Sequence, residues 1–128
     1  MTAAHDVRLT IQSFVDAFNR GDSAALDEMF EEQGVVVPAP GQPMTGDARR
    51  AAQKHLLGFG SPMRAEPRDI YVAGDVALVL MEWSMRGTTP DGHEIDMGGT
   101  ATDIFRRGED GRWRYLIDNP FGTVPPSS

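Results

Sequence analysis

The sequence contains no cysteine among its 128 residues, which excludes disulfides, thiolate metal ligands and cysteine nucleophiles. Basic residues are scarce: 12 Lys and Arg stand against 19 Asp and Glu, giving a formal net charge of −7. Such a surface repels phosphate, so we expect neither nucleic acid nor an anionic membrane as a partner. The longest apolar run, residues 76–81, is too short to cross a bilayer, and no signal peptide is visible. We therefore expect a cytoplasmic protein with one domain over residues 1–128.

Hydrophobic residues make up 40% of the sequence, and their spacing in the first third is typical of helices. One apolar stripe predicts a first helix of about four turns, and it consists of Val7, Ile11, Phe14, Val15 and Phe18. Asp22 or Ser23 can cap a second helix, in which Leu26, Met29 and Phe30 share one face.

The chain then passes through a short predicted strand at 35–37, a proline-containing loop at 38–43 and a third helix at 47–57. The second half is instead rich in β-forming residues, at 70–73, 75–86, 94–107 and 112–119, with turn dipeptides between them. Three helices followed by a meander of antiparallel strands predict an α+β fold with the helices on one face of the sheet.

The hairpin turns decide which side chains share a face of this sheet. Two-residue turns at 91–92 and 110–111 would place Leu80 opposite Asp103, and Asp103 opposite Asp118. One face then carries Leu78, Leu80, Glu82, Ala101, Asp103, Phe105, Leu116 and Asp118. The other carries Val79, Met81, Trp83, Met85, Thr100, Thr102, Ile104, Trp113, Tyr115 and Ile117.

Both predicted faces are too apolar to be freely solvated, so one should meet the helices and the other a second subunit. The pattern by itself favours the face of Trp83 and Trp113 as the core side, which would leave the carboxylates outside.

The sequence also resembles a known superfamily, in residues 14–30, 38–46 and 102–119 and in the order of its predicted elements. The resemblance is to SnoaL-like and ketosteroid isomerase-like members of the nuclear transport factor 2-like superfamily. It implies a cystatin-like cone, in which three N-terminal helices close a curved antiparallel sheet over about residues 5–122. The composition of residues 123–128 separately predicts a loose tail. The resemblance also implies an apolar ligand in the cone, Asp103 and Asp118 inside it, and a homodimer through the outer sheet face. That outer face would carry Met81, Trp83, Met85 and Trp113.

The sequence departs from ketosteroid isomerase at the positions of its catalytic groups. The tyrosine of that enzyme's first helix and the aspartate before its proline loop match Phe14 and Val37, which neither donate nor accept a proton. Phe30 replaces a supporting tyrosine. Only the aspartate of the penultimate strand is retained, as Asp103, and in that enzyme it stays protonated and donates to the oxyanion. We therefore do not expect a typical ketosteroid isomerase.

Asp103 and Asp118 form the strongest candidate catalytic pair, because two carboxyls that face each other in a dry cavity share a proton and can act as acid and base. In the alternative, Asp118 binds Arg114 or backbone groups at the sheet edge. His55 on the third helix is a further candidate, although a lone histidine on an apolar face is more often a core residue. The residues expected to line the ligand pocket are Phe14, Phe18, Phe30, Val37, Phe59, Leu80, Glu82, Ala101, Phe105 and Leu116.

These residues predict a protein that binds a small apolar molecule. As an enzyme it would be an isomerase, cyclase or hydrolase that uses carboxylate acid–base chemistry without a cofactor. The alternative is a non-catalytic ligand-binding protein or a dimeric regulatory module with the same cone. The three histidines lack metal-ligand spacing, so no metal site is predicted.

Overall fold

The computed structural model describes residues 2–126, and over this range it has the predicted α+β architecture. The helical part comprises α1 (Ala3–Asn19), α2 (Ser23–Glu28) and α3 (Gly46–Leu57). The strands are β1 (Phe30–Val36), β2 (Met63–Ala73), β3 (Val76–Thr88), β4 (Glu94–Arg107) and β5 (Trp113–Asp118). The last two residues of the tail that was expected to be loose lie outside the described range.

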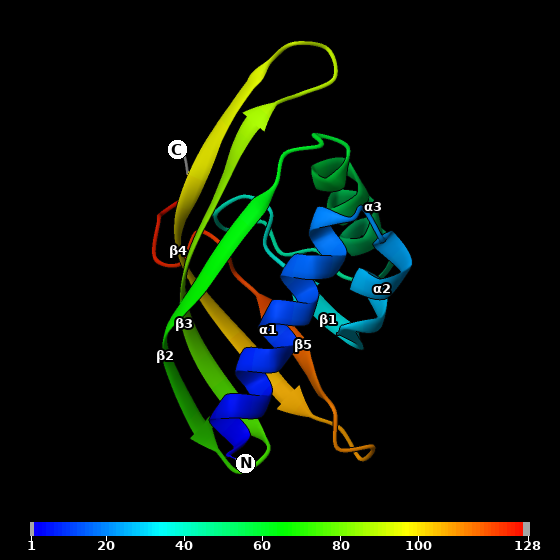
Figure 1. Cartoon of the computed structure of the whole chain (residues 1–128). Coiled ribbons are helices and arrows are strands. Elements are labelled where there is room, and N and C mark those ends of the chain that lie inside the picture. Colours follow the sequence, from blue (N-terminus) through cyan, green and yellow to red (C-terminus); the bar gives the residue numbers. More distant parts are fainter. Residues whose placement is uncertain (1, 127–128) are drawn as a thin grey trace.

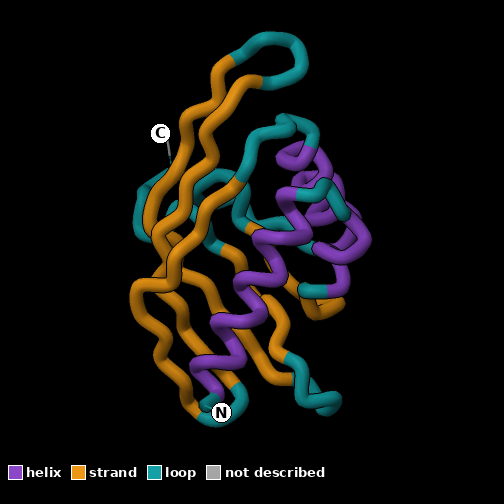
Figure 2. Tube along the Cα trace, in the orientation of Figure 1, coloured by secondary structure: helices purple, strands orange, loops and turns teal. Residues whose placement is uncertain are grey.

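The strands form one curved sheet in the order β1-β5-β4-β3-β2, and all three helices lie on its concave side (Figures 1 and 2). Strand β1 runs parallel to β5, and the other neighbours are antiparallel. The hairpin of β3 and β4 projects beyond the helices (Figure 1). A cone-shaped sheet closed by N-terminal helices is therefore confirmed.

Helix α1 follows the predicted stripe, since Val7, Ile11, Phe14 and Phe18 are buried against the sheet. Its first turn is capped by Thr2, whose hydroxyl accepts the backbone N–H of His5 at 3.1 Å. The prediction for Phe30 was wrong: α2 ends at Glu28, and Phe30 begins β1 rather than continuing the helix. The ring of Phe30 then stacks on Tyr115 of the neighbouring strand, with ring centroids 5.0 Å apart.

The predicted register of the β3–β4 hairpin was wrong by one residue. Thr88 pairs with Glu94, so the connection has an odd length, and Asp103 lies opposite Val79 instead of Leu80. A shift of one residue turns every side chain of a strand to the other face. The concave face of β3 therefore carries Met81, Trp83 and Met85, all buried.

The face expected to form a dimer is consequently the core side of the sheet. Trp113 of β5 is buried there as well. The four residues Met81, Trp83, Met85 and Trp113 contribute to the monomer's own core and cannot serve as an exposed interface.

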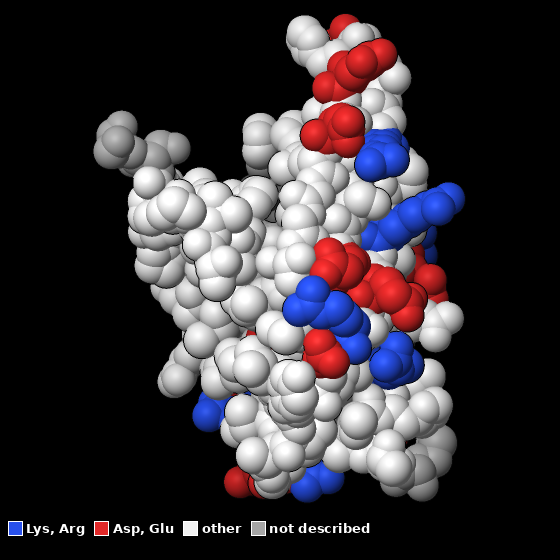
Figure 3. Space-filling model, turned by 90° about the vertical axis from the view of Figure 1, so that its left-hand side faces the viewer, with Lys and Arg blue, Asp and Glu red and all other residues white. Residues whose placement is uncertain are grey.

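The surface seen in Figure 3 is the sheet side of the molecule, where charged residues of both signs gather along one edge. Arg68 pairs with Glu82 and Asp69, and Arg86 pairs with Asp96. Arginines thus pair with Asp69, Glu82 and Asp96 of these strands. Among residues 2–126, no helix combines the length and apolarity that a membrane span requires.

Candidate functional site

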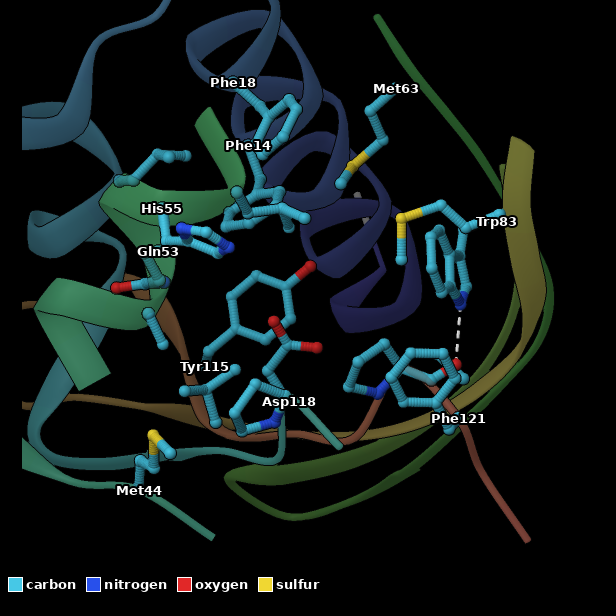
Figure 4. A pocket seen from close by; sticks show the side chains of 18 of the residues that line it. Phe14, Phe18, Met44, Gln53, His55, Met63, Trp83, Tyr115, Asp118 and Phe121 are labelled. Atoms are coloured by element: carbon cyan, nitrogen blue, oxygen red, sulfur yellow. Dashed lines mark hydrogen bonds between the residues drawn. The ribbon is translucent and has the colours of Figure 1, made fainter. Parts of the chain in front are cut away.

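A cavity of about 660 Å³ lies between the concave face of the sheet and helices α1 and α3. Its wall is almost entirely apolar, which is typical of small-molecule sites. The lining side chains come from every layer of the fold: Phe14, Phe18, Leu26, Val36, Pro38, Met44, Ala48, Ala51, Ala52, Gln53, His55, Leu56, Phe59, Met63, Met81, Trp83, Met97, Ala101, Tyr115, Asp118, Pro120 and Phe121. Figure 4 shows that the polar groups Asp118, Tyr115 and His55 face this otherwise apolar space.

Four of the ten predicted lining residues do line the cavity: Phe14, Phe18, Phe59 and Ala101. The others were misplaced for identifiable reasons. Phe30 and Phe105 are buried in the core beneath Tyr115, and the lining valine is Val36 rather than Val37.

Three further predicted lining residues were wrong because of the strand register. Leu80 and Glu82 lie on the convex face, where the carboxylate of Glu82 accepts hydrogen bonds from Arg68 and Thr100. Leu116 is displaced from the pairing pattern of β5 and does not line the cavity.

The structure brings Asp103 and Asp118 together at the floor of the cavity. Asp103 is completely buried, and its Oδ1 accepts the backbone N–H of Asn119 at 2.9 Å. Its Oδ2 has no other donor among the described residues, and the carboxyl of Asp118 lies within hydrogen-bonding reach. A proton held between the two carboxyls gives Asp103 Oδ2 the partner that a buried oxygen needs.

The surroundings make the two carboxyls unequal. Burial and the negative charge of Asp118 raise the pKa of Asp103 well above its usual range. Burial also raises the pKa of Asp118, to about 6, while the hydrogen bond with Asp103 opposes the rise. At neutral pH the proton therefore resides on Asp103, and Asp118 presents an ionised carboxylate to the cavity.

In the described structure Asp118 does not form the ion pair with Arg114 that was its alternative role. Arg114 instead donates two hydrogen bonds to Asp110 in the β4–β5 turn. Asp118 thus lacks a cationic partner among residues 2–126, and its charge is compensated only by the proton of Asp103.

A β-bulge in β5 explains why Tyr115 and Asp118 point the same way although their numbers have opposite parity. Tyr115 and Ile117 pair with the consecutive residues Phe105 and Ile104 of β4, so Leu116 is the extra residue. Tyr115 therefore faces inward, and so does Asp118 three residues later. The predicted register placed Tyr115 on the outer face, so Tyr115 was not among the predicted site residues.

Aromatic rings hold Tyr115 on three sides. The ring centroids lie 5.0 Å from Phe14, 5.0 Å from Phe30 and 4.1 Å from Phe105. The phenol points toward the cavity, beside Asp118 (Figure 4). Burial and the two aspartates raise the pKa of Tyr115, so the hydroxyl keeps its proton at neutral pH.

Helix α3 forms the wall opposite the sheet and is fixed by a buried arginine. Arg49 donates to Asp27 of α2 and to Oε1 of Gln53, both at 2.9 Å, and lies 4.6 Å over the Phe30 ring. These contacts turn the alanines and His55 of α3 toward the cavity. His55 packs edge-on against Phe59, with ring centroids 5.1 Å apart. In the described part of the chain it forms no hydrogen bond with Asp103 or Asp118.

Metal ligands do not gather in this site. Within the described part of the chain, no three side chains of His, Asp or Glu lie close enough together to hold a metal ion.

Comparisons with known proteins agree with this geometry. The profile of the SnoaL-like domain family matches residues 11–116. A comparison with curated proteins gives no match. Solved structures with the same fold include a protein with a cystatin-like fold from Caulobacter vibrioides, at 22% identity and a TM-score of 0.72, covering 94% of this chain and 89% of that one.

Two other solved structures are similar over nearly the whole chain. One is a candidate dehydratase of the NTF2-like family from Streptomyces avermitilis, with 20% identity, a TM-score of 0.75, and 94% and 96% of the two chains covered. The other is a ketosteroid isomerase-like protein from Erwinia carotovora, with 19% identity, a TM-score of 0.69, and 95% and 97% covered. At these identities the likeness establishes the fold.

Proposed function

The chain belongs to the SnoaL-like domain family, and on this basis we propose that its cavity binds a small apolar molecule and that Asp118 moves a proton on it. The observation that carries the proposal is a pair of adjacent carboxyls at the floor of an apolar cavity, of which Asp118 faces the open space. Burial raises the pKa of Asp118 to about 6. A base of that pKa is matched to work near neutral pH. The reaction would be an isomerisation, a cyclisation or an elimination of the kind that begins with loss of a proton next to a carbonyl.

Each member of the pair has a distinct part in this proposal. Asp118 accepts the proton because it faces the cavity, whereas Asp103 lies behind it and has no surface of its own. Asp103 acts as a positioning residue: its hydrogen bonds to Asn119 and to Asp118 fix the direction of the base. The neighbouring candidate dehydratase and ketosteroid isomerase-like structures are compatible with chemistry of this class.

Hydrogen exchange offers a test that does not require the natural substrate. The protein is incubated in D2O with a panel of apolar ketones, and loss of the α-hydrogen signals is followed by NMR. We expect Asp118→Asn to slow exchange by about 10²-fold or more, the usual contribution of a general base. Glu82→Gln removes an exposed carboxylate on the convex face and serves as the matched control.

The result also separates the enzyme from a ligand-binding protein with the same cavity. That second function is favoured by the apolar residues Phe14 and Val36, which line the cavity and provide no proton donor or acceptor. If neutral apolar ligands bind but no ketone exchanges faster than in the absence of protein, the binding function replaces the catalytic one. Unchanged exchange in Asp118→Asn would rule out Asp118 as the base.

A further inference from the structure

The Tyr115 phenol is a hydrogen-bond donor that the fold leaves without a partner. Its hydroxyl makes no hydrogen bond with any residue in 2–126, and Figure 4 shows it directed into the cavity beside Asp118. Asp103 and Asp118 act on the phenol through their charges, and neither forms a hydrogen bond with it. The hydroxyl borders the open space of the cavity, so an acceptor atom of a ligand there can take its hydrogen bond.

The direction of this donor is fixed before any ligand arrives. The rings of Phe14, Phe30 and Phe105 enclose Tyr115 on three sides, so the phenol cannot swing away. A donor that is already oriented binds an acceptor without losing rotamer entropy. Phe14 stands where ketosteroid isomerase has a tyrosine on its first helix, and it packs directly against Tyr115. The hydroxyl in this region therefore comes from β5.

Charge then restricts what the acceptor can be. The lining of the cavity includes no lysine or arginine, and its one strongly charged group at neutral pH is the Asp118 carboxylate. A carboxylate, phosphate or sulfonate placed beside the phenol would be repelled by Asp118 and would find no lysine or arginine in the wall. A neutral acceptor oxygen meets neither cost.

We propose that Tyr115 is the specificity-determining residue of the cavity, and that it selects neutral apolar molecules whose carbonyl oxygen accepts its hydroxyl proton in preference to organic anions of the same shape. This inference rests on the proposed function, since it assumes that the cavity is a ligand site. In the proposed reaction the ligand's C–H bond breaks, the proton passes to an Asp118 oxygen, and the electron pair shifts through the carbonyl onto the oxygen that Tyr115 faces. Return of the proton to carbon restores Asp118.

Three naphthalenes of similar size provide the probes: 2-acetylnaphthalene has a neutral acceptor oxygen, 2-ethylnaphthalene has none, and 2-naphthoate is an anion. Their dissociation constants are measured by calorimetry for the wild type, for Tyr115→Phe and for Tyr71→Phe. Tyr71 is the other tyrosine of the chain and is 57% exposed on β2, so its variant is the matched control.

We expect Tyr115→Phe to weaken 2-acetylnaphthalene binding by about three- to tenfold, the usual value of one hydrogen bond, and to leave 2-ethylnaphthalene unchanged. In the wild type, 2-naphthoate should bind at least about tenfold more weakly than the ketone. Retention of 2-ethylnaphthalene binding by Tyr115→Phe also shows that the variant is folded.

Equal effects of Tyr115→Phe on the ketone and the hydrocarbon would overturn the inference while leaving the apolar ligand site intact. Binding of 2-naphthoate as tight as that of the ketone would also overturn it. Failure of 2-ethylnaphthalene to bind the wild type would instead contradict the proposed function, because an apolar cavity of this size should accept it.

Discussion

Asp103 links protonation of the site to the stability of the fold. The pKa values of Asp103 and Asp118 are both raised from the ordinary aspartate value of 3.8, mainly because the carboxyls are buried. Between about pH 4 and the folded-state pKa values, the native protein therefore holds more protons than the unfolded chain. The free energy of unfolding must then fall as pH rises through this window. The acids whose pKa values are lowered, Asp22, Asp27 and Asp110, have the opposite effect but act below pH 3.8.

Asp103→Asn should remove most of this penalty. The amide oxygen can still accept the Asn119 N–H, and the amide NH2 can donate to Asp118, so both hydrogen bonds of the wild type survive. We expect the variant to be more stable than the wild type by about 1–3 kcal/mol near pH 8, and the gain to shrink toward pH 5. Urea unfolding at both pH values measures the difference. An equal increase in the free energy of unfolding at the two pH values would mean that Asp103 and Asp118 share no proton.

At the scale of elements, the two hairpins show which sequence signals were misread. The dipeptide Asp91-Gly92 predicts a two-residue turn with positive φ at both residues, but no residue other than glycine has positive φ in the described chain. Pro90, whose fixed φ suits the second position of a type I turn, sets a turn over 89–92 instead, closed by the Gly92 N–H and the Thr89 oxygen. Gly92 then turns left-handed, and the loop between Thr88 and Glu94 has an odd number of residues, 89–93.

A turn of the same kind closes the β4–β5 hairpin. There Gly111 has a φ of 79°, and its N–H donates a hydrogen bond to the backbone oxygen of Gly108. Two odd-length loops and the Leu116 bulge together decide the faces of the sheet. Helix α1 was predictable from its periodicity. Asp103 and Asp118 were predicted to be adjacent from a two-residue turn, and they are adjacent because the Leu116 bulge offsets the odd length of the loop between β4 and β5. The inward position of Tyr115 was not predictable, because nothing in the local sequence marks Leu116 as a bulge.

The loop after β5 provides a test at the same scale. Gly122 has a φ of 57°, and a Cβ there would lie 2.3 Å from the backbone oxygen of Thr100. Gly74, in the β2–β3 turn, has a φ of 58° but would meet nothing within 4 Å. We expect Gly74→Ala to cost about 1–2 kcal/mol through φ alone, and Gly122→Ala to cost clearly more. Thermal unfolding compares them, and equal losses would mean that the loop moves away from β4 without strain.

At the scale of the whole molecule, the sheet separates an apolar concave side from a convex side with paired charges. The homodimer predicted from the sequence stays a prediction, and any interface would have to use residues other than Met81, Trp83, Met85 and Trp113, because these fill the core. Met81 is 6% exposed and lines the cavity near the carboxyl pair.

Substitutions at two adjacent residues of β3 test which of its side chains face the concave side of the sheet. Met81→Glu places a third carboxylate in the apolar interior and should lower the free energy of unfolding by about 2 kcal/mol or more. Leu80→Glu changes a half-buried residue of the convex face and should cost less. Urea unfolding gives both values, and the opposite order would restore the register predicted from the sequence.

The parallel pairing of β1 with β5 also has a consequence for how the chain acquires its shape during synthesis. Phe30 has its partner in Tyr115, so the first strand made must wait until nearly all the other strands have been translated. Contacts between such distant segments form slowly, because a long loop must be closed first. The cavity is therefore among the last features to appear on a growing chain, and until then the apolar side of the unfinished sheet lacks the strand that completes its floor.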